Sequence, residues 1–203
     1  MRACTIDGDA KANEDYIPFD GIIEFGNGEH TKTFAVGIKD DDNWEPDEDF
    51  FCQLYSVDHG EELTGQDTKT KITIIDDDKP GQIVFAEAKA VQALASEEFA
   101  DIIIQRKNGS DGIVTVDYAT HMLDDTPHTA TAGKDFEHAK GTLEFGGGET
   151  EKTIQVKIIQ RDDEVRDESF AIQLSNVTPA GAKLSKKSFM IVNIVTDVEN
   201  KKK

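Results

Sequence analysis

The chain repeats itself at a fixed offset of 120 residues. Residues 13–39 read NEDYIPFDGIIEFGNGEHTKTFAVGIK, and residues 133–159 read GKDFEHAKGTLEFGGGETEKTIQVKII. The match continues without a gap as far as residue 74, through pairs such as Asp15 with Asp135, Phe50 with Phe170 and Ile74 with Ile194. Such a repeat indicates two copies of one folded module. A chain of 203 residues has room for two small domains, and we place them at 1–79 and 80–200.

Both copies alternate apolar with polar or small residues, and this period of two predicts strands that bury one face. The predicted strands are residues 33–38, 71–74, 82–85, 100–104, 113–118, 153–158 and 170–174. The glycine-rich residues 26–28 and 146–148 are typical of hairpin turns that need positive φ angles. Short strands at this spacing predict an all-β fold of two immunoglobulin-like sandwiches in tandem.

The two copies differ at their beginnings. The second copy starts with three strand candidates, and the first copy has nothing before residue 13 that matches them. We therefore expect the first module to lack its N-terminal strands, because it is either truncated or completed by another chain. A sandwich without those strands would expose its core and its sheet edges. The short junction Asp76–Gly81 contains Pro80, so we expect it to hold the modules end to end.

Charge excludes two classes of partner. The net charge is −19 at pH 7, whereas nucleic acids and anionic membranes are bound by basic surfaces. No run of residues approaches the length of an apolar membrane span, so we expect no membrane insertion of this segment. Cys4 and Cys52 are too few for a disulfide framework. We expect two reduced thiols in an intracellular setting, although the sequence leaves a bridge between them open.

The acidic residues concentrate in the first copy. Residues 1–80 hold 21 acidic and 7 basic residues, and the runs Asp40–Asp42 and Asp76–Asp78 each follow a predicted strand. If those two strands run in the same direction, both runs lie at one tip of the sandwich. Carboxylates so close together repel one another unless they are protonated, solvated or neutralised by a cation. Ca²⁺ suits such a cluster because it takes 6–8 oxygen ligands in adaptable geometry. The alternative is a solvated acidic surface.

Signatures of catalysis are missing from the sequence. It contains no G-x-S-x-G nucleophile elbow and no Walker or dinucleotide-binding loop. It also has no histidine- or cysteine-rich spacing of the kind that Zn²⁺ requires. We therefore do not expect an enzyme.

The arrangement resembles a known family. Residues 12–16 (ANEDY), Gly21, Phe25 and Gly28, then residues 38–42 (IKDDD), Glu45, residues 48–50 (EDF) and residues 75–78 (IDDD), together resemble the Calx-beta motif. The tandem, with its second copy starting just after an aspartate triplet, resembles the large cytoplasmic regulatory loop of sodium/calcium exchangers. The resemblance covers nearly the whole chain.

The resemblance implies a Ca²⁺ site in the first module, at the loops next to the second. The matching ligands here are Asp15, Asp40, Asp41, Glu45, Glu48, Asp76, Asp77 and Asp78. The family pattern adds a glutamate from the loop after a first strand that this copy lacks. In the second module, Gln160, Arg161, Val165, Thr196 and Val198 stand at ligand positions, and only Asp135, Glu168 and Asp197 stay acidic. We expect that module to bind Ca²⁺ weakly or not at all.

The implied function is that of a Ca²⁺-sensing regulatory pair in an exchanger-like membrane transporter. Its partners would be Ca²⁺ and the transmembrane part of the transporter, and its location the cytoplasmic face of a membrane. Binding would order the acidic loops and stiffen the junction between the modules. One alternative is a Calx-beta structural or adhesion module in which Ca²⁺ only rigidifies an array. A second is an interaction module that binds no ion.

Overall fold

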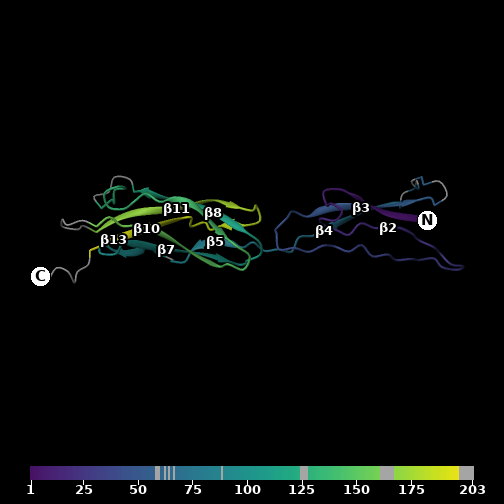
Figure 1. Cartoon of the computed structure of the whole chain (residues 1–203), viewed down its shortest axis with the longest axis horizontal. Coiled ribbons are helices and arrows are strands. Elements are labelled where there is room, and N and C mark those ends of the chain that lie inside the picture. The colour runs from purple at the N-terminus through teal and green to yellow at the C-terminus, as the bar shows by residue number, and fades with distance from the viewer. Residues whose placement is uncertain are drawn as a thin grey trace. The chain divides into compact units, whose positions relative to one another are not determined.

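A computed structural model of the chain describes residues 1–57, 60–61, 63, 65, 67–87, 89–123, 128–160 and 167–196. These residues form strands and loops, and none of them lies in a helix (Figure 1). The chain divides into two compact units, Met1–Asp77 and Asp78–Lys203, which we call unit 1 and unit 2. Each unit is described by itself below.

Unit 2 is a two-layered β-sandwich. One sheet has the strand order β10-β7-β5-β12, and the other has the order β6-β13-β11-β8-β9 (Figure 1). Most neighbours are antiparallel, but β12 pairs with β5 and β13 pairs with β6 in parallel. The strands are β5 (Gln82–Phe85), β6 (Val91–Leu94), β7 (Phe99–Lys107), β8 (Val114–Met122), β9 (Lys140–Phe145), β10 (Glu151–Lys157), β11 (Glu168–Thr178), β12 (Lys183–Leu184) and β13 (Phe189–Val195).

One apolar core fills the space between these two sheets. The inward residues of β7 and β10 alternate with exposed or half-buried ones, as the period of two predicted, whereas β11 buries three residues in a row at 170–172. Phe136 stacks on Phe170 of β11, with ring centroids 4.2 Å apart. The all-β sandwich predicted for this copy is therefore confirmed.

The described residues of unit 1 form one sheet, with the strand order β2-β1-β3-β4. Its strands are β1 (Arg2–Asp7), β2 (Asp20–Ile22), β3 (Glu48–Tyr55) and β4 (Lys69–Ile74). Asp7 of β1 pairs with Phe50, as Met122 of β8 pairs with Phe170, so β1 is the counterpart of β8. The expectation that the first copy has no counterpart of the 113–118 strand was wrong. The offset falls from 120 to 115 there, and this shift hid the match.

The strand predicted at residues 33–38 is not formed. Among the described residues, this segment has one isolated bridge, between Ile38 and Tyr16. Its counterpart in unit 2 is β10, which pairs with β7 along its whole length. The described residues of unit 1 include no equivalent of β7. A strand is defined by its neighbour, so the right side-chain pattern does not produce one here.

The glycine turns were predicted correctly in conformation and wrongly in connectivity. Gly28 and Gly148 have φ angles of 82° and 77°, which glycine adopts without strain. In unit 2, however, the turn at 146–148 joins β9 to β10, which belong to different sheets. The turn therefore carries the chain from one layer to the other, and it is not a hairpin between paired strands.

The two cysteines lie on opposite faces of the unit 1 sheet. Thr5 pairs with Cys52 and Cys4 pairs with Gln53, and side chains of directly paired residues point to the same face. Cys52 therefore faces the buried side, and both thiols are free. The structure decides the question that the sequence left open.

Candidate metal centre

The repeat extends to the hydrogen bonds of the loop that carries the first candidate ligand. The Asp15 carboxylate accepts a hydrogen bond from the Lys11 amide at 2.6 Å, and Asp135 accepts one from the Thr131 amide at 2.8 Å. Residues 12 and 16 form a bridge, as do residues 132 and 136. This turn fixes the Asp15 side chain beside the start of β3.

Three of the eight candidate ligands form a cluster. Asp15, Glu45 and Glu48 each offer a carboxylate oxygen, and these oxygens all lie within 4.8 Å of one another. Asp15 and Glu48 are half-buried, whereas Glu45 is exposed. Among the described residues of the chain, this is the one group of three acidic, histidine or cysteine side chains spaced to share a metal ion. We call it the carboxylate cluster.

Asp76 lies at the edge of the carboxylate cluster. Its carboxylate accepts a hydrogen bond from the Glu45 amide at 3.3 Å. In return, the Asp76 amide donates to the Asp47 carboxylate at 3.3 Å. The segment after β4 is thus tied to the loop before β3. The meeting of Asp40–Asp42 with Asp76–Asp78 stays a prediction. Sequence reasoning missed the role of Asp47, whose place in an acidic stretch gave no separate signal.

Glu48 is a member of the cluster whose ionised form is disfavoured by its surroundings. Burial raises the pKa of its carboxyl, and the negative charges of Asp15, Glu45 and Asp9 raise it further. Asp9 was not among the predicted ligands. It follows β1, and the amide of the next residue, Ala10, donates to the Asp49 carbonyl at 3.1 Å. Asp9 lies two residues after the end of β1. It could have been predicted as a candidate only if that strand had been predicted.

The remaining four candidates lie outside the carboxylate cluster as the structure stands. The Asp41 carboxylate caps its own turn by accepting from the Asn43 amide at 2.7 Å. Asp40 and Asp77 belong to unit 1 but are not members of the cluster. Asp78 is the first residue of unit 2.

The cluster fits a hard divalent cation. The donors of the cluster are carboxylate oxygens, which Ca²⁺ prefers. Ca²⁺ also accepts a flexible coordination geometry, so the cluster does not have to hold its oxygens at fixed angles. Burial, and after it repulsion by the Asp15 and Glu45 carboxylates, raises the pKa of Glu48. A cation between them would relieve that repulsion.

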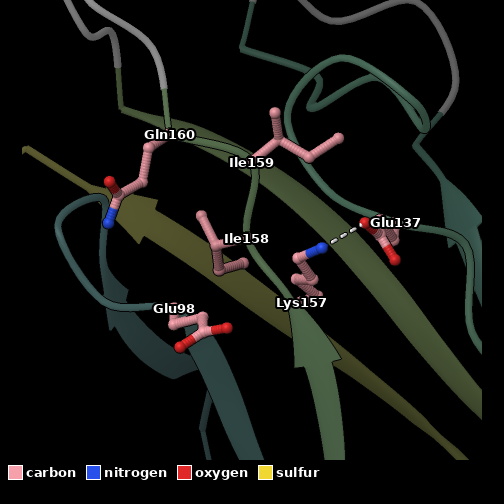
Figure 2. A pocket seen from close by; sticks show the side chains of 6 residues that line it. All are labelled: Glu98, Glu137, Lys157, Ile158, Ile159 and Gln160. Atoms are coloured by element: carbon pink, nitrogen blue, oxygen red, sulfur yellow. Dashed lines mark hydrogen bonds and ion pairs between the residues drawn. The ribbon is translucent and has the colours of Figure 1, made fainter.

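Residues 157–160 of unit 2, which correspond to residues 37–40 of unit 1, carry different side chains. Figure 2 shows a shallow hollow there, in which the Lys157 ammonium reaches the Glu137 carboxylate at 2.7 Å. Gln160, at the position of Asp40, donates its amide to the Ser96 carbonyl at 3.0 Å. Lys157 stands at the position of Gly37 in unit 1. A fixed positive charge and an amide therefore lie where unit 1 has glycine and aspartate. The predictions for residues 161, 165, 197 and 198, and for 162–164, concern positions outside the described residues.

A buried arginine anchors the start of unit 2. The Arg106 guanidinium donates to the carbonyls of Pro80 at 2.7 Å, Gly112 at 3.0 Å and Gly146 at 3.1 Å, and also to that of Asp111. The Asp111 carboxylate accepts from the Lys79 amide at 2.9 Å. Residues 79 and 80 are thereby fixed to unit 2. This role of Arg106 could not be predicted, since in the sequence it resembles any basic residue near the end of a strand.

These features define a class: a tandem of two copies of one β module in which, among the described residues, only unit 1 holds a carboxylate cluster. The Calx-beta domain profile matches the chain twice, over residues 2–78 and 76–197. The chain therefore belongs to the Calx-beta domain family.

Several of the matching relatives are sodium/calcium exchangers. The chain is 34% identical to human sodium/calcium exchanger 3 over 190 residues, and 31% identical to rat sodium/calcium exchanger 1 over 205 residues. These alignments cover 84% and 93% of this chain but 20% of each relative. The chain thus spans about one fifth of the length of the curated relatives it matches. The resemblance to the exchanger family is confirmed.

Solved structures agree on the fold. The apo form of the Calx CBD1 domain is 28% identical, with a TM-score of 0.50, over 57% of this chain and 96% of that one. The Calx CBD2 domain is 22% identical, with a TM-score of 0.53, over 61% of this chain and 91% of that one.

Within the described residues, no helix could cross a membrane.

Proposed function

We propose that this chain is the Ca²⁺-sensing regulatory pair of a sodium/calcium exchanger-like transporter. The observation that carries the proposal is the carboxylate cluster of Asp15, Glu45 and Glu48, within 4.8 Å of one another in unit 1. The exchanger relatives supply the context of a membrane transporter. The chain would be a loop at the cytoplasmic face, and it would have no catalytic role of its own.

Residues Asp76–Asp78 would couple Ca²⁺ binding to the order of the junction between the two units. Asp76 contacts the loop before β3, and residues 79 and 80 are held by unit 2. Only Asp77 and Asp78 lie between these two anchors. Ca²⁺ held by the cluster together with Asp76–Asp78 would therefore order the few residues that separate the units. Ca²⁺ can bias this order only by binding the ordered state more tightly than the disordered one.

Unit 2 would receive the signal without binding the ion itself. The Lys157–Glu137 ion pair and the Gln160 amide occupy the corresponding end of that unit. Ca²⁺ would have to displace or oppose a positive charge there, which lowers its affinity.

Tumbling measurements test the coupling. Amide ¹⁵N relaxation gives a separate rotational correlation time for each unit, and these times differ when a junction is flexible. If Ca²⁺ stiffens the junction, the two times converge on its addition, and they stay apart in an Asp76→Asn, Asp77→Asn variant. If the two correlation times were already equal with no ion added, the result would favour the alternative of a structural Calx-beta array. Times that remain apart at saturating Ca²⁺ would contradict the sensing mechanism.

A further inference from the structure

The chain contains two asparagines that directly precede a glycine. One pair is Asn27–Gly28 in unit 1, and the other is Asn108–Gly109 in unit 2. Such a pair can lose ammonia without an enzyme, because the backbone nitrogen of the glycine attacks the side-chain Cγ of the asparagine. Glycine permits this attack because it has no Cβ and its backbone turns freely. In a folded protein the rate therefore depends on how firmly the surroundings hold the backbone of the pair.

The turn that carries Asn27–Gly28 is open on all sides. Every residue from 24 to 32 is exposed. Gly28 has a φ angle of 82°, and a Cβ built on it would meet no atom within 4 Å. Two hydrogen bonds join Gly26 to Glu29: the Glu29 amide donates to the Gly26 carbonyl at 3.1 Å, and the Glu29 carboxylate accepts from the Gly26 amide at 2.6 Å. These bonds flank the Asn27–Gly28 pair without holding it.

The repeat shows what a restrained version of this turn looks like. Gly148, the counterpart of Gly28, donates its amide to the Ser110 carbonyl at 2.8 Å. Within the described part of unit 1, no backbone carbonyl accepts from the Gly28 amide. Unit 2 also has Gly147 in place of Asn27, so its turn offers no side chain to attack. The attacking nitrogen and the reactive amide thus occur together only in the turn of unit 1.

The Asn108–Gly109 pair, by contrast, is held by its neighbours. A Cβ built on Gly109 would collide with the carbonyl oxygen of Lys79, so the two backbones are in close contact. The buried Arg106 guanidinium donates to the carbonyls of Asp111 and Gly112, which fixes the residues that follow the pair. Ring closure requires the Gly109 nitrogen to move toward the Asn108 side chain, and that movement would break this packing.

We propose that Asn27 is a modification site at which unit 1 deamidates spontaneously. The Gly28 nitrogen gives its proton to hydroxide and forms a bond to Cγ of Asn27, and the side-chain nitrogen takes a proton from water and leaves as ammonia. Water then opens the cyclic imide at either carbonyl, which leaves an aspartate or an isoaspartate at position 27. No oxidant or reductant takes part.

Both products change the turn. Each adds a negative charge near the Glu29 carboxylate, and isoaspartate also lengthens the backbone by one carbon atom. The modification is confined to unit 1, since its counterpart in unit 2 is a glycine. This inference rests on the geometry of the turn and does not depend on Ca²⁺ binding.

Timed incubation of the full chain in a mildly alkaline buffer tests the proposal. Peptide mass spectrometry follows the mass gain at each pair, and chromatography separates the aspartate from the isoaspartate peptides. The same incubation in urea is the reference, because unfolding removes the surroundings that distinguish the two pairs. An Asn27→Gly chain, which carries the residue that unit 2 has at this position, is the matched control. Circular dichroism establishes that the chain without urea is folded.

In the folded chain, Asn27 should convert at least roughly tenfold faster than Asn108, since a held segment must first open locally before it can react. In urea the two rates should approach each other. The Asn27→Gly chain should lose the fast conversion and keep the slow one at Asn108. Equal rates in the folded chain would overturn the proposal, as would conversion at neither pair. A rate ratio that is unchanged in urea would also overturn it, because the difference would then come from the local sequence.

Discussion

Glu48, at the start of β3, lies against Asp15, and their carboxylate oxygens are within 4.8 Å of each other. The neighbouring charges and partial burial raise the pKa of the Glu48 carboxyl above its ordinary value of 4.5. A raised pKa means that the folded state binds the proton more tightly than the unfolded state. Without a cation, the contribution of Glu48 to stability is therefore favourable at low pH and is lost as the pH rises through its folded pKa.

Glu48→Gln should reproduce the protonated form at every pH. At pH 7 without Ca²⁺, we expect the variant to unfold at a higher temperature than the original chain, because one of three repelling charges is gone. The difference should vanish as the pH falls to about 4.5 and below, where the original carboxyl holds its own proton. Thermal unfolding followed by circular dichroism at several pH values measures this.

Glu14→Gln is the matched control, since Glu14 is an exposed neighbour in the same loop. It should leave the unfolding temperature nearly unchanged. A Glu48→Gln variant less stable than the original chain at pH 7 would show that the cluster is not repulsive.

The substitution Tyr16→Phe should lower the stability of unit 1 by an amount that depends on pH. The Tyr16 hydroxyl donates to the Asp7 carboxylate at 2.5 Å, and this bond lowers the pKa of Asp7. Its stabilisation is present above the ordinary pKa of Asp7 and is lost as the pH falls through the lowered one. We therefore expect the variant to be less stable at pH 7 and almost equal to the original chain in strong acid.

The same bond and burial raise the pKa of Tyr16 to about 12. Absorbance at 295 nm should therefore show one tyrosine that ionises only near pH 12, and Tyr16→Phe should remove that step. Unit 2 has Phe136 at this position, stacked on Phe170 as Tyr16 is on Phe50, so the aromatic ring alone is tolerated. Loss of folding in Tyr16→Phe would contradict this reading.

Arg106→Lys should destabilise unit 2 despite conserving the charge. One lysine ammonium cannot reach the four carbonyls that the guanidinium joins. Each buried carbonyl left without a donor costs about 1–3 kcal/mol, so we expect a loss on the order of 3 kcal/mol. Urea unfolding should show it, with Lys107→Arg on the exposed side of β7 as the control. An Arg106→Lys chain as stable as the original would mean that the four bonds contribute little.

The cysteines should resist pairing. Cys4 and Cys52 point to opposite faces of the unit 1 sheet, and burial raises the pKa of the Cys52 thiol. A maleimide should label Cys4 quickly and Cys52 slowly, because the thiolate is the reactive form. After mild oxidation, intact-mass measurement should detect no loss of two hydrogen atoms within a monomer. Formation of an intramolecular disulfide would contradict the strand register.

Local patterns were enough to predict the fold class. The repeat at 120 residues is visible in the structure as repeated hydrogen bonds: Gly26 and Gly146 both donate to a glutamate three residues later. Pairing between distant segments was harder to predict. Residues 33–38 have the alternation of β10, but among the described residues they form one isolated bridge and pair with no strand. β1 was hidden by a change of offset in a loop.

The candidate site shows the same limit. Asp15, Glu45 and Glu48 are separated in sequence, and their meeting depends on the turn at residues 11–15 and the start of β3. Asp9 lies near the cluster because the neighbouring Ala10 amide donates to the Asp49 carbonyl, and Asp47 because its carboxylate accepts from the Asp76 amide. The spacing of these residues in the sequence does not predict either hydrogen bond. The anchoring of residues 79 and 80 by Arg106 depends on burial, and a basic residue at a strand end gives no hint of burial.

Calorimetric titration of the chain with Ca²⁺ tests the central claim most directly, with Mg²⁺ and an Asp76→Ala, Asp77→Ala variant as controls. The account predicts micromolar or tighter Ca²⁺ binding, in the range of cytosolic sensors, which Mg²⁺ does not reproduce and the double variant abolishes. Circular dichroism of the same samples establishes that unit 1 is folded. Absence of Ca²⁺ binding by a folded chain would contradict the account and leave the carboxylate cluster as a solvated acidic surface.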